Sequence, residues 1–327
     1  MATMKAVRVH KFGDSKQLKY ETNVARPQPA DDQVLVKVRA VGVNPIDAYV
    51  RTGGFGPQSF PYIPGMDFAG IVEQVGNQVT DVKKGERVYG STTDGMNNAY
   101  AEYIAVKANF VHPLPDVLSY SQGAAIPVPY FTAYRALFHL ASAKPGETVL
   151  VHGASGGVGV AAVQLARGSG LRVIGTAGTP AGADLVKKAG AHHVFDHRKE
   201  GYMDEVKAAI GEGGADIVIE NVCNKNLKKD LDVVGEGGRI VVVGGLGEIP
   251  INPLDLILKE VAVVGVFFFK MSSQQLFQTR SAIQAGVEAG WLRPQIWKEL
   301  SLERASEAQD ILASGSGAQG KIILKVD

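Results

Sequence analysis

The chain has 327 residues, which is more than one ordinary hydrophobic core holds and suits two domains. Its 34 basic and 33 acidic residues leave a formal net charge of +1, without the excess of positive charge that is typical of nucleic-acid-binding proteins. The single cysteine, Cys223, excludes an intrachain disulfide and a cysteine-based zinc site. The first residues lack the apolar core of a signal peptide and no apolar run could span a bilayer, so we expect a cytoplasmic protein with no membrane partner.

The region up to about Pro127 predicts a β-rich domain. Short runs that alternate in polarity or are rich in β-branched residues recur between turns rich in glycine and proline, a pattern typical of a compact, barrel-like fold. The predicted strands are Ala6–His10, Gln33–Val41, Gly70–Val75, Arg87–Gly90 and Ala99–Tyr103.

The middle of the chain predicts an α/β domain. After helical pieces over Gln122–Leu140, strands and helices alternate strictly, and most strands are continuously apolar, which indicates a doubly wound parallel sheet buried on both faces. The predicted strands are Thr148–Val151, Leu171–Gly175, His193–Phe195, Asp216–Glu220, Arg239–Gly244 and Val261–Phe268, and the helices include Ala181–Lys188, Met203–Ile210 and Leu227–Val234. From about Ser272, two helices and a final strand, Lys321–Val326, do not extend this series and could return to the first domain.

A glycine motif lies at the first strand of the α/β region. Residues 147–167 predict a strand, a loop containing Gly153, Gly156 and Gly159, and a helix, although the spacing is one residue longer than the usual G-x-G-x-x-G. Glycines let the backbone approach a ligand closely, and the N–H groups at a helix N-terminus favour an anion such as pyrophosphate. A glycine-rich turn without a ligand is the alternative.

The end of the second strand of this region bears on the choice of cofactor. An acidic residue about 20 positions after the glycine motif would bind the ribose 2′-hydroxyl of NAD. Here Thr176 and Ala177 occupy that region, Thr176 and Thr179 could donate hydrogen bonds, and His197 and Arg198 could supply positive charge. We therefore predict NADPH rather than NADH, with solvated loop residues as the alternative interpretation of His197 and Arg198.

Several motifs together point to a known family. They are Gly42–Tyr49, Pro64–Asp67, Pro129–Tyr134, Gly146–Arg167, Gly175–Thr179, Phe195–Arg198 and Gly315–Leu324. At these positions the chain resembles the zinc-independent quinone oxidoreductases of the medium-chain dehydrogenase/reductase superfamily, the group that includes zeta-crystallin. The resemblance implies a GroES-like β-barrel catalytic domain in two pieces, residues 1–125 and 269–327, around a Rossmann NADPH-binding domain over residues 126–268.

The same resemblance argues against zinc. The zinc alcohol dehydrogenases of the superfamily have a cysteine where this chain has Asn44, and a His-Glu pair where it has Met66 and Asp67. A catalytic zinc needs about three good protein ligands, so we expect no metal.

The resemblance also assigns residues. Asn44 and Tyr49 fall at the nicotinamide side, where Tyr49 could hydrogen-bond an acceptor carbonyl and Asn44 could polarise a carbonyl or only position the ribose. The remaining cofactor positions are Ser155, Gly156, Gly157 and Val158 for the phosphates; Gly178, Thr179, His197 and Asn226 for the adenosine and 2′-phosphate; and Val243, Gly244, Gly245, Leu246, Val266, Phe267 and Phe268 beside the ring. Where bacterial relatives have a lysine for the 2′-phosphate, this chain has Gly182.

The expected function is NADPH-dependent reduction of quinones in a cleft between the two domains. Reduction of an enone or alkenal double bond is an alternative, as is a non-enzymatic role as a crystallin-like structural protein or an RNA-binding protein. The apolar strand Val261–Phe269 ends the sheet, and in the superfamily the corresponding strands pair across a two-fold axis, so we expect a homodimer at least. The resemblance also allows a homotetramer.

Overall fold

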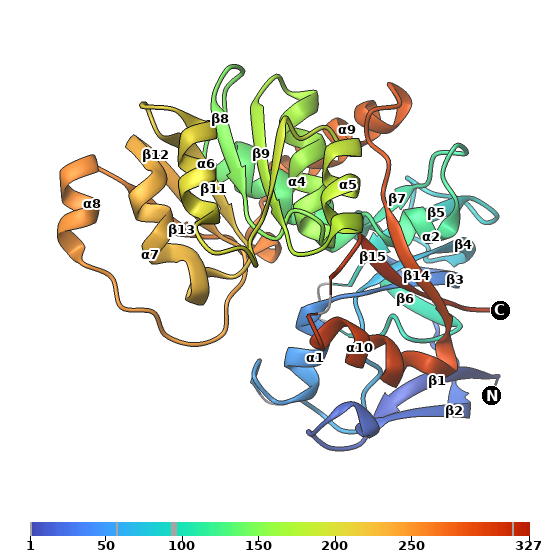
Figure 1. Cartoon of the computed structure of the whole chain (residues 1–327). Coiled ribbons are helices and arrows are strands. Elements are labelled where there is room, and N and C mark those ends of the chain that lie inside the picture. Colours follow the sequence, from blue (N-terminus) through green and yellow to red (C-terminus); the bar gives the residue numbers. More distant parts are fainter. Residues whose placement is uncertain (1, 57, 93–96, 316) are drawn as a thin grey trace. The chain divides into compact units, whose positions relative to one another are not determined.

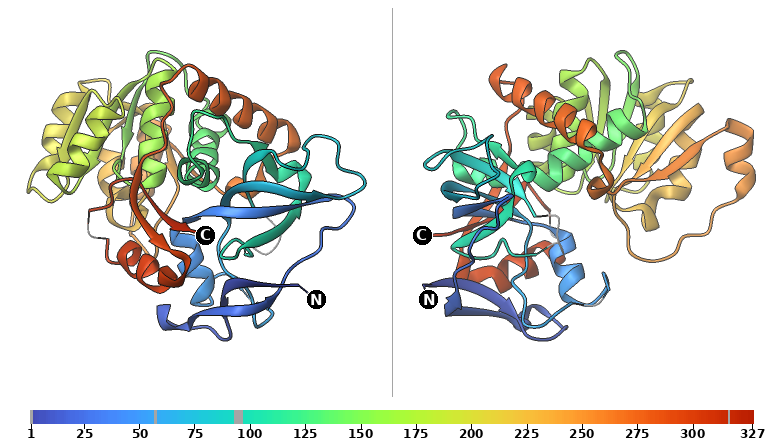
Figure 2. Two further views of the ribbon diagram at one scale, coloured as in Figure 1. Left: turned by 90° about the vertical axis from the view of Figure 1, so that its right-hand side faces the viewer. Right: turned by 180° about the vertical axis from the view of Figure 1, so that it is seen from behind.

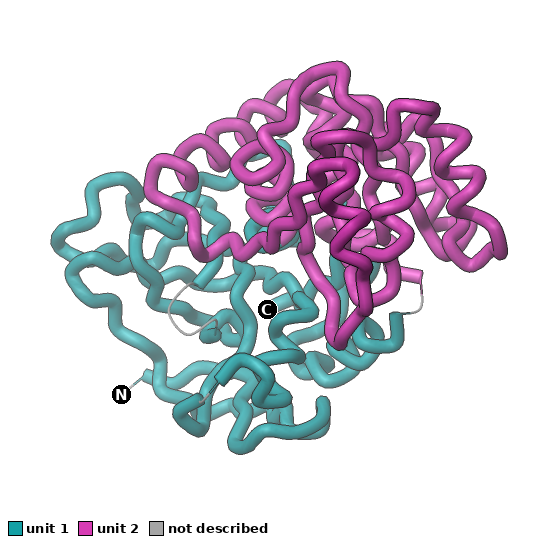
Figure 3. The backbone as a smooth tube through the Cα atoms, turned by 90° about the vertical axis from the view of Figure 1, so that its left-hand side faces the viewer, with its two compact units in different colours: residues 1–128, 294–316, 321–327 teal, residues 129–293, 317–320 magenta. Residues whose placement is uncertain are grey.

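The computed structural model describes residues 2–56, 58–92, 97–315 and 317–327, so Ser316 of the C-terminal motif lies outside the described residues. The chain forms two compact units, shown in separate colours in Figure 3. Unit 1 comprises Met1–Val128, Pro294–Ser316 and Lys321–Asp327, and unit 2 comprises Pro129–Arg293 and Gly317–Gly320.

Unit 1 is built on strands from both ends of the sequence. Its larger sheet has the order β14-β15-β3-β4-β5-β7, with β6 also paired to β3, and a separate hairpin joins β1 to β2 (Figure 1). The strands are β1 (Thr3–Val9), β2 (Leu18–Ala25), β3 (Gln33–Val43), β4 (Asp67–Val75), β5 (Arg87–Ser91), β6 (Tyr103–Lys107), β7 (Val111–Pro113), β14 (Ile296–Ser301) and β15 (Lys321–Lys325), and the helices are α1 (Pro45–Arg51), α2 (Tyr120–Ala124) and α10 (Ala305–Ala313). The C-terminal strand β15 runs antiparallel to β3, and it thereby completes the sheet that the N-terminal region begins.

Unit 2 contains a six-stranded parallel sheet of order β10-β9-β8-β11-β12-β13. In chain order this is 3-2-1-4-5-6, the doubly wound arrangement of dinucleotide-binding domains. The strands are β8 (Thr148–Val151), β9 (Arg172–Ala177), β10 (His193–Asp196), β11 (Ala215–Glu220), β12 (Val234–Val242) and β13 (Ala262–Gly265), and the helices are α3 (Pro127–Tyr134), α4 (Gly157–Gly168), α5 (Pro180–Lys188), α6 (Tyr202–Ile210), α7 (Cys223–Val233), α8 (Pro253–Lys259) and α9 (Ser273–Glu288).

Helices cover both faces of the unit 2 sheet (Figures 1 and 2). On one face, Val206 of α6 and Leu231 of α7 pack in one buried cluster with Leu150, Val218 and Ile240 of the strands. Right-handed crossovers place α4 and α5 on the opposite face. Because both faces are covered, the strands can be apolar at consecutive positions, which explains their continuous hydrophobic runs.

Two segments depart from the expected division of the chain at residue 268. Helix α9 belongs to unit 2, where Arg135 Nη1 donates to Gln275 Oε1 at 2.9 Å and Ile283 and Val287 are buried. The stretch Gly317–Gly320 also belongs to unit 2, because Gly320 N donates to Ser155 O at 2.8 Å. The return to unit 1 therefore begins at Pro294 and is interrupted once more before β15.

Some predicted strands have different limits. The sixth strand of the parallel sheet is Ala262–Gly265 rather than Val261–Phe268, because Phe268–Lys270 form a 3-10 turn. Val263 is 39% exposed, so this outer strand is only partly covered. In unit 1, Ala99–Ala101 form isolated contacts, including a bridge from Ala101 to Ala6, and β6 begins only at Tyr103.

Candidate functional site

The glycine loop of unit 2 connects β8 to α4. Gly153 has φ +59°, a left-handed conformation that glycine adopts without strain. The loop is fastened to the neighbouring strand, because Ala154 N donates to Thr176 O at 2.8 Å. Gly156 is the N-cap of α4, so the unpaired N–H groups of the first helical turn begin directly after it.

Two glycines of the loop differ in what surrounds them. A Cβ on Gly159 would lie 2.6 Å from Ala154 Cα and closer still to Gly153 O, so Gly159 allows the helix to pack on the loop. A Cβ on Gly156 would meet only Gly153 O, at 3.5 Å, so the space in front of Gly156 is open. An open space at a helix N-terminus, bordered by backbone N–H groups, fits a pyrophosphate. Of the predicted phosphate positions, Ser155 additionally binds Gly320 through its carbonyl oxygen.

The threonine at the end of β9 has a different role from the one expected. Thr176 is 1% exposed, and its Oγ1 accepts a hydrogen bond from Gly153 N at 3.2 Å. Its side chain therefore holds the glycine loop instead of donating to a cofactor, which corrects the expectation for this residue. Ala177 is also buried, and neither of these two residues is acidic.

The structure brings His197 and Arg198 to the turn after β9. A Cβ on Gly178 would lie 2.7 Å from His197 Nε2 and 2.9 Å from Arg198 Nε, so both side chains lie beside this turn. Partial desolvation lowers the pKa of His197, and the positive charges of Arg198 and Lys225 act in the same direction, while Asp196 opposes them. The Arg198 guanidinium therefore lies beside this turn, and Lys225 acts electrostatically on His197.

Thr179 and Gly182, which follow this turn, have structural roles. Thr179 caps α5, since its Oγ1 accepts a hydrogen bond from Gly182 N at 3.1 Å. A Cβ on Gly182 would lie 3.0 Å from Thr179 Oγ1 and 3.1 Å from Ser155 Oγ. A lysine at position 182 would therefore require these neighbours to move, which gives a physical reason for glycine there.

The residues expected beside the nicotinamide ring follow β12 and β13. Val243 N donates to Glu220 O at 2.8 Å and Gly244 O accepts from Cys223 N at 2.9 Å, so the start of this loop is anchored to the end of β11. Gly245 follows directly, and Leu246 is 69% exposed. After β13, Val266 N donates to Val242 O at 2.9 Å.

The phenylalanines after Val266 differ in exposure. Phe268 is buried at 8% exposure, with its ring 4.0 Å from that of Phe269, so it contributes to packing and not to an open surface. Phe267 is partly exposed. Asn226, in the first turn of α7, is held by a 3.3 Å hydrogen bond from its Nδ2 to Glu220 Oε1.

In unit 1, Asn44 belongs to a buried polar network. It is 1% exposed and its Nδ2 donates to Asp67 Oδ2 at 2.9 Å. The ammonium of Lys321 donates to Asn44 Oδ1 and also to Asp67 Oδ2, the latter at 3.2 Å. Asn44 is thus engaged by protein groups on both sides of its amide, which favours the positioning role over polarisation of a carbonyl.

Burial perturbs every ionisable group of this network. It raises the pKa of Asp67, although Lys321 and Asn44 oppose the shift. It raises the pKa of Asp47 to about 7, against the hydrogen bond from the backbone of Asn44 and the charge of Lys321. Burial also lowers the pKa of Lys321, against the attraction of Asp67 and Asp47.

The contacts within this network show whether these residues could bind a catalytic zinc ion. The expected ligand positions hold an amide, the thioether of Met66 and one carboxylate, and the Lys321 ammonium lies against both Asn44 and Asp67. A cation already neutralises the carboxylate, and the donor set is poor for zinc. These residues do not fit a catalytic metal.

Tyr49, the other predicted catalytic residue, lies on α1 and is 36% exposed. Its ring packs edge-on against Phe55, with 6.1 Å between ring centroids. Its ring also lies against Gly54, where a Cβ would overlap it. Tyr49 is therefore a partly exposed ring with a fixed orientation.

The sequence analysis did not identify Lys321, which belongs to the buried network of Asn44 and Asp67. The signal available in the sequence was a lysine directly before the apolar residues Ile322–Leu324. In the structure this lysine is only 5% exposed. Buried lysines are rare unless paired, so a lysine in such a run points to an internal partner.

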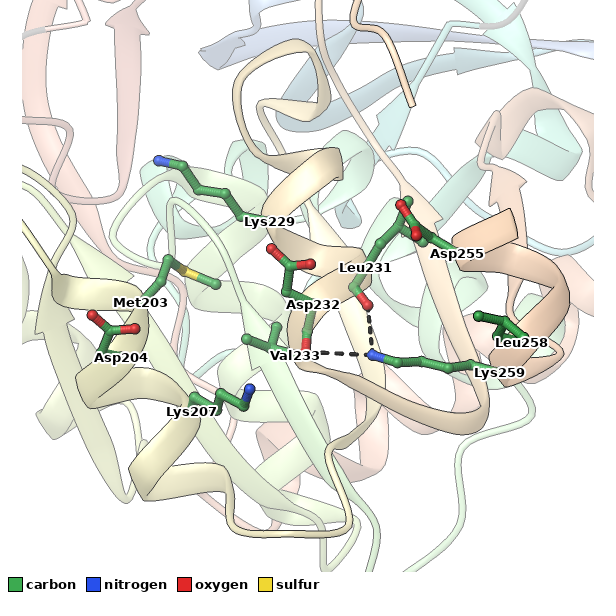
Figure 4. A pocket seen from close by; sticks show the side chains of 10 residues that line it. All are labelled: Met203, Asp204, Lys207, Lys229, Leu231, Asp232, Val233, Asp255, Leu258 and Lys259. Carbon is green, nitrogen blue, oxygen red and sulfur yellow. Dashed lines mark hydrogen bonds between the residues drawn. The ribbon is translucent and has the colours of Figure 1, made fainter. Parts of the chain in front are cut away.

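A surface hollow of about 380 Å³ lies among α6, α7 and α8 of unit 2 (Figure 4). Its lining residues are Met203, Asp204, Lys207, Lys229, Leu231, Asp232, Val233, Asp255, Leu258 and Lys259. Lys259 Nζ donates to the carbonyl oxygens of Leu231 at 2.7 Å and Val234 at 3.0 Å. Lys259 thereby satisfies the C-terminus of α7, which accounts for its position without a ligand.

Among the described residues, none of the helices combines the length and the apolar character that a membrane span needs.

Comparison with known proteins identifies the family. Residues 30–116 match the alcohol dehydrogenase GroES-like domain, and residues 157–284 match the zinc-binding dehydrogenase family. The chain is 49% identical to human quinone oxidoreductase over 322 residues, which covers 98% of this chain and 97% of the human protein.

Solved structures agree with this result. The Escherichia coli quinone oxidoreductase complexed with NADPH is 28% identical, with a TM-score of 0.89 over 98% of this chain and 100% of that one. The Pseudomonas syringae quinone oxidoreductase is 28% identical, with a TM-score of 0.91 over 99% of this chain and 100% of that one. The chain therefore belongs to the zinc-independent quinone oxidoreductase family of the medium-chain dehydrogenases/reductases, with a GroES-like and a Rossmann-type domain.

Proposed function

We propose that the protein is an NADPH-dependent quinone reductase. The observation that carries the proposal is the open space in front of Gly156 at the N-terminus of α4, in a chain 49% identical to human quinone oxidoreductase. The N–H groups of the first turn of α4 are available to a pyrophosphate, because intrahelical bonding begins with Val160 N, which donates to Gly156 O at 2.8 Å.

The end of β9 supports NADPH over NADH. Thr176 and Ala177 are buried and neutral, so no carboxylate there would repel a 2′-phosphate. Arg198 lies beside Gly178, and Lys225 adds positive charge nearby. A charge-assisted hydrogen bond contributes about 1.5–3 kcal/mol, so one such contact gives a preference of about tenfold or more.

The protein's own contribution to the reaction is binding and orientation. NADPH, when bound, would supply the electrons that reduce the quinone. The helix N-terminus at Gly156 holds the pyrophosphate, and Gly178 with His197, Arg198 and Asn226 receives the adenosine end. The loops at Val243–Leu246 and Val266–Phe267 are proposed to lie beside the nicotinamide ring. A reduced quinone takes its protons from water, so this reaction requires no strong general acid.

Tyr49 is proposed to hydrogen-bond the acceptor carbonyl, since this residue is 36% exposed and its ring packs against Phe55. Asn44 is proposed to act indirectly, by holding the start of α1 through Asp67 and Lys321.

The test is a comparison of acceptors with the purified protein. NADPH oxidation is followed at fixed cofactor concentration with a small para-quinone and with an α,β-unsaturated ketone. We expect rapid turnover with the quinone and a several-fold lower kcat/KM with the ketone. Turnover of the ketone alone would replace the proposal with the double-bond reductase alternative, and failure of NADPH to bind would remove both.

We further propose that the protein assembles as a symmetric dimer through the outer edge of β13. In the described structure β13 is the last strand of its sheet, with Val263 39% exposed. Nearby in the chain, Leu254, Ile257 and Leu258 of α8 are 49%, 68% and 69% exposed. An uncovered strand edge and exposed aliphatic side chains both favour association with another chain.

Light scattering tests the assembly. We expect a mass of at least twice the 34.7 kDa of the chain at micromolar concentration. The variant Val263→Lys should shift the population towards monomer, whereas Val117→Lys, at a 62% exposed valine of unit 1, is the matched control. A wild-type monomer would contradict the proposal.

A further inference from the structure

Three ionisable side chains lie buried beneath the glycine loop. His152 directly follows β8, Glu220 ends β11, and Asp230 lies on α7. Their exposed fractions are 1%, 0% and 0%. Residues of this type are seldom fully buried without partners, so a group of three in one place needs an explanation.

The three side chains meet one another. His152 Nε2 lies 2.9 Å from Asp230 Oδ1 and 4.0 Å from Glu220 Oε2. His152 Nε2, Glu220 Oε2 and both carboxylate oxygens of Asp230 are buried without a well-aligned hydrogen bond. Protons shared among these atoms would satisfy them, because a protonated carboxyl or imidazole can donate to the neighbouring oxygen.

The cluster is connected to the glycine loop through Thr176. His152 Nδ1 lies 3.3 Å from Thr176 Oγ1, and that same oxygen accepts the hydrogen bond of Gly153 N at 3.2 Å. A continuous chain of contacts thus runs from Asp230 through His152 and Thr176 to the backbone of Gly153.

The cluster is also connected to the loop that follows β11. Glu220 Oε1 accepts hydrogen bonds from Val222 N and from Asn226 Nδ2. Asn221 Nδ2 donates to His152 O at 2.7 Å, which ties the two strand ends together. The segments that carry Gly156 and Asn226 are therefore both connected to this cluster.

We propose that His152, Glu220 and Asp230 are positioning residues that share protons and hold the glycine loop, through Thr176, in the shape that binds NADPH. The inference rests on the proposed function, because it takes the glycine loop to be the cofactor loop. None of the three touches the cofactor in this scheme. They act through Thr176 and Asn226.

The scheme has a pH dependence with a definite sign. Burial raises the pKa of Glu220 to about 7 and that of Asp230 to about 7, and it lowers the pKa of His152. The folded arrangement therefore favours protonated carboxyls and a neutral imidazole. As the pH rises through about 7, two carboxylates face each other in the interior, and the loop should lose its fixed shape.

Among the residues that the structure describes, few other charged or titratable groups surround the cluster. Tyr202 of α6 and Cys223 of α7 have raised pKa values from burial, and both remain neutral in this range. Lys229 of α7 acts on His152 and Asp230, and its ammonium lies 5.3 Å from the centre of the Tyr202 ring. His197 also lies within electrostatic reach of His152. Lys229 and His197 are present in the wild type and in every variant below.

The experiment compares NADPH dissociation constants by fluorescence titration, together with thermal unfolding of the cofactor-free protein. Thr176→Val keeps the side-chain volume and removes the hydroxyl group, and we expect its NADPH affinity to fall about tenfold or more. Thr176→Ser keeps the hydroxyl group and should remain within about threefold of the wild type. Equal affinity of the Val variant and the wild type would overturn the proposal, even if the variant melted at a lower temperature.

The pH profile provides a second, independent measurement. The dissociation constant of Glu220→Gln is divided by that of the wild type at each pH from 6 to 8.5, which cancels the titration of the 2′-phosphate and of His197. We expect this ratio to fall as the pH rises through about 7, because only the wild type acquires the second carboxylate. A ratio independent of pH would overturn the shared-proton arrangement.

Metal analysis tests a different use of the cluster, since His, Glu and Asp are also metal ligands. We expect no stoichiometric metal, and a metal lost in His152→Ala but retained in the wild type would overturn the proposal. Failure of the proposed function is distinguishable, because then the wild type itself would not bind NADPH.

Discussion

Substituting Gly156 by valine should abolish cofactor binding in a protein that remains folded. Gly156 has φ −77° and ψ 173°, an extended conformation that valine adopts readily. Its Cβ would meet only Gly153 O at 3.5 Å, so the branched side chain would extend into the open space in front of α4. That space is where the pyrophosphate is proposed to bind.

The expected loss of NADPH affinity follows from the hydrogen bonds to the pyrophosphate that would be lost. Displacing the pyrophosphate from two backbone N–H groups removes about 1.5–3 kcal/mol for each charge-assisted hydrogen bond. The total of about 3–6 kcal/mol corresponds to a loss of affinity of about 10²- to 10⁴-fold. Valine is a poor N-cap residue, and this should cost no more than about 1 kcal/mol of stability.

The assay is a fluorescence titration with NADPH, combined with circular dichroism and thermal unfolding. Gly159→Ala is the matched control in the same loop, because its Cβ would lie 2.6 Å from Ala154 Cα. We expect this variant to lose stability, whereas Gly156→Val should melt within a few degrees of the wild type. Normal NADPH binding by Gly156→Val would refute the assignment of the loop.

Three further predictions concern charge and metal. Lys321→Met should lower stability by about 3–5 kcal/mol, because it leaves Asp67 buried without its cation, and thermal unfolding should show that Lys321→Met/Asp67→Leu recovers part of the loss. An unchanged melting temperature of the single variant would contradict a buried ion pair. Activity should survive exhaustive chelation, and elemental analysis should find no stoichiometric zinc; activity lost on chelation and restored by zinc would show the opposite. The wild type should bind NADPH at least about tenfold more tightly than NADH, and Arg198→Ala should reduce this ratio with little change in NADH affinity. Equal dissociation constants for the two cofactors in the wild type would disprove the preference.

The sequence by itself determined the parts of this protein that depend on local pattern. The alternation of continuously apolar strands with helices predicted the doubly wound sheet, because a strand covered on both faces has no polar side. The glycines between Gly153 and Gly159 predicted the loop, since few other residues tolerate a positive φ or such close packing. The absence of an acid at Thr176 and of zinc ligands at Asn44 and Met66 could be read directly.

The tertiary structure alone decided which distant groups meet. Lys321 contacts Asn44 across a separation of 277 residues, and no local periodicity encodes such a pairing. The same holds for His152, Glu220 and Asp230, which come together only when β8, β11 and α7 pack. Thr176 illustrates the difference most clearly. Its position at the end of a strand suggested a donor for the cofactor, but packing turned its hydroxyl group inward to Gly153, because a buried backbone N–H must find an acceptor.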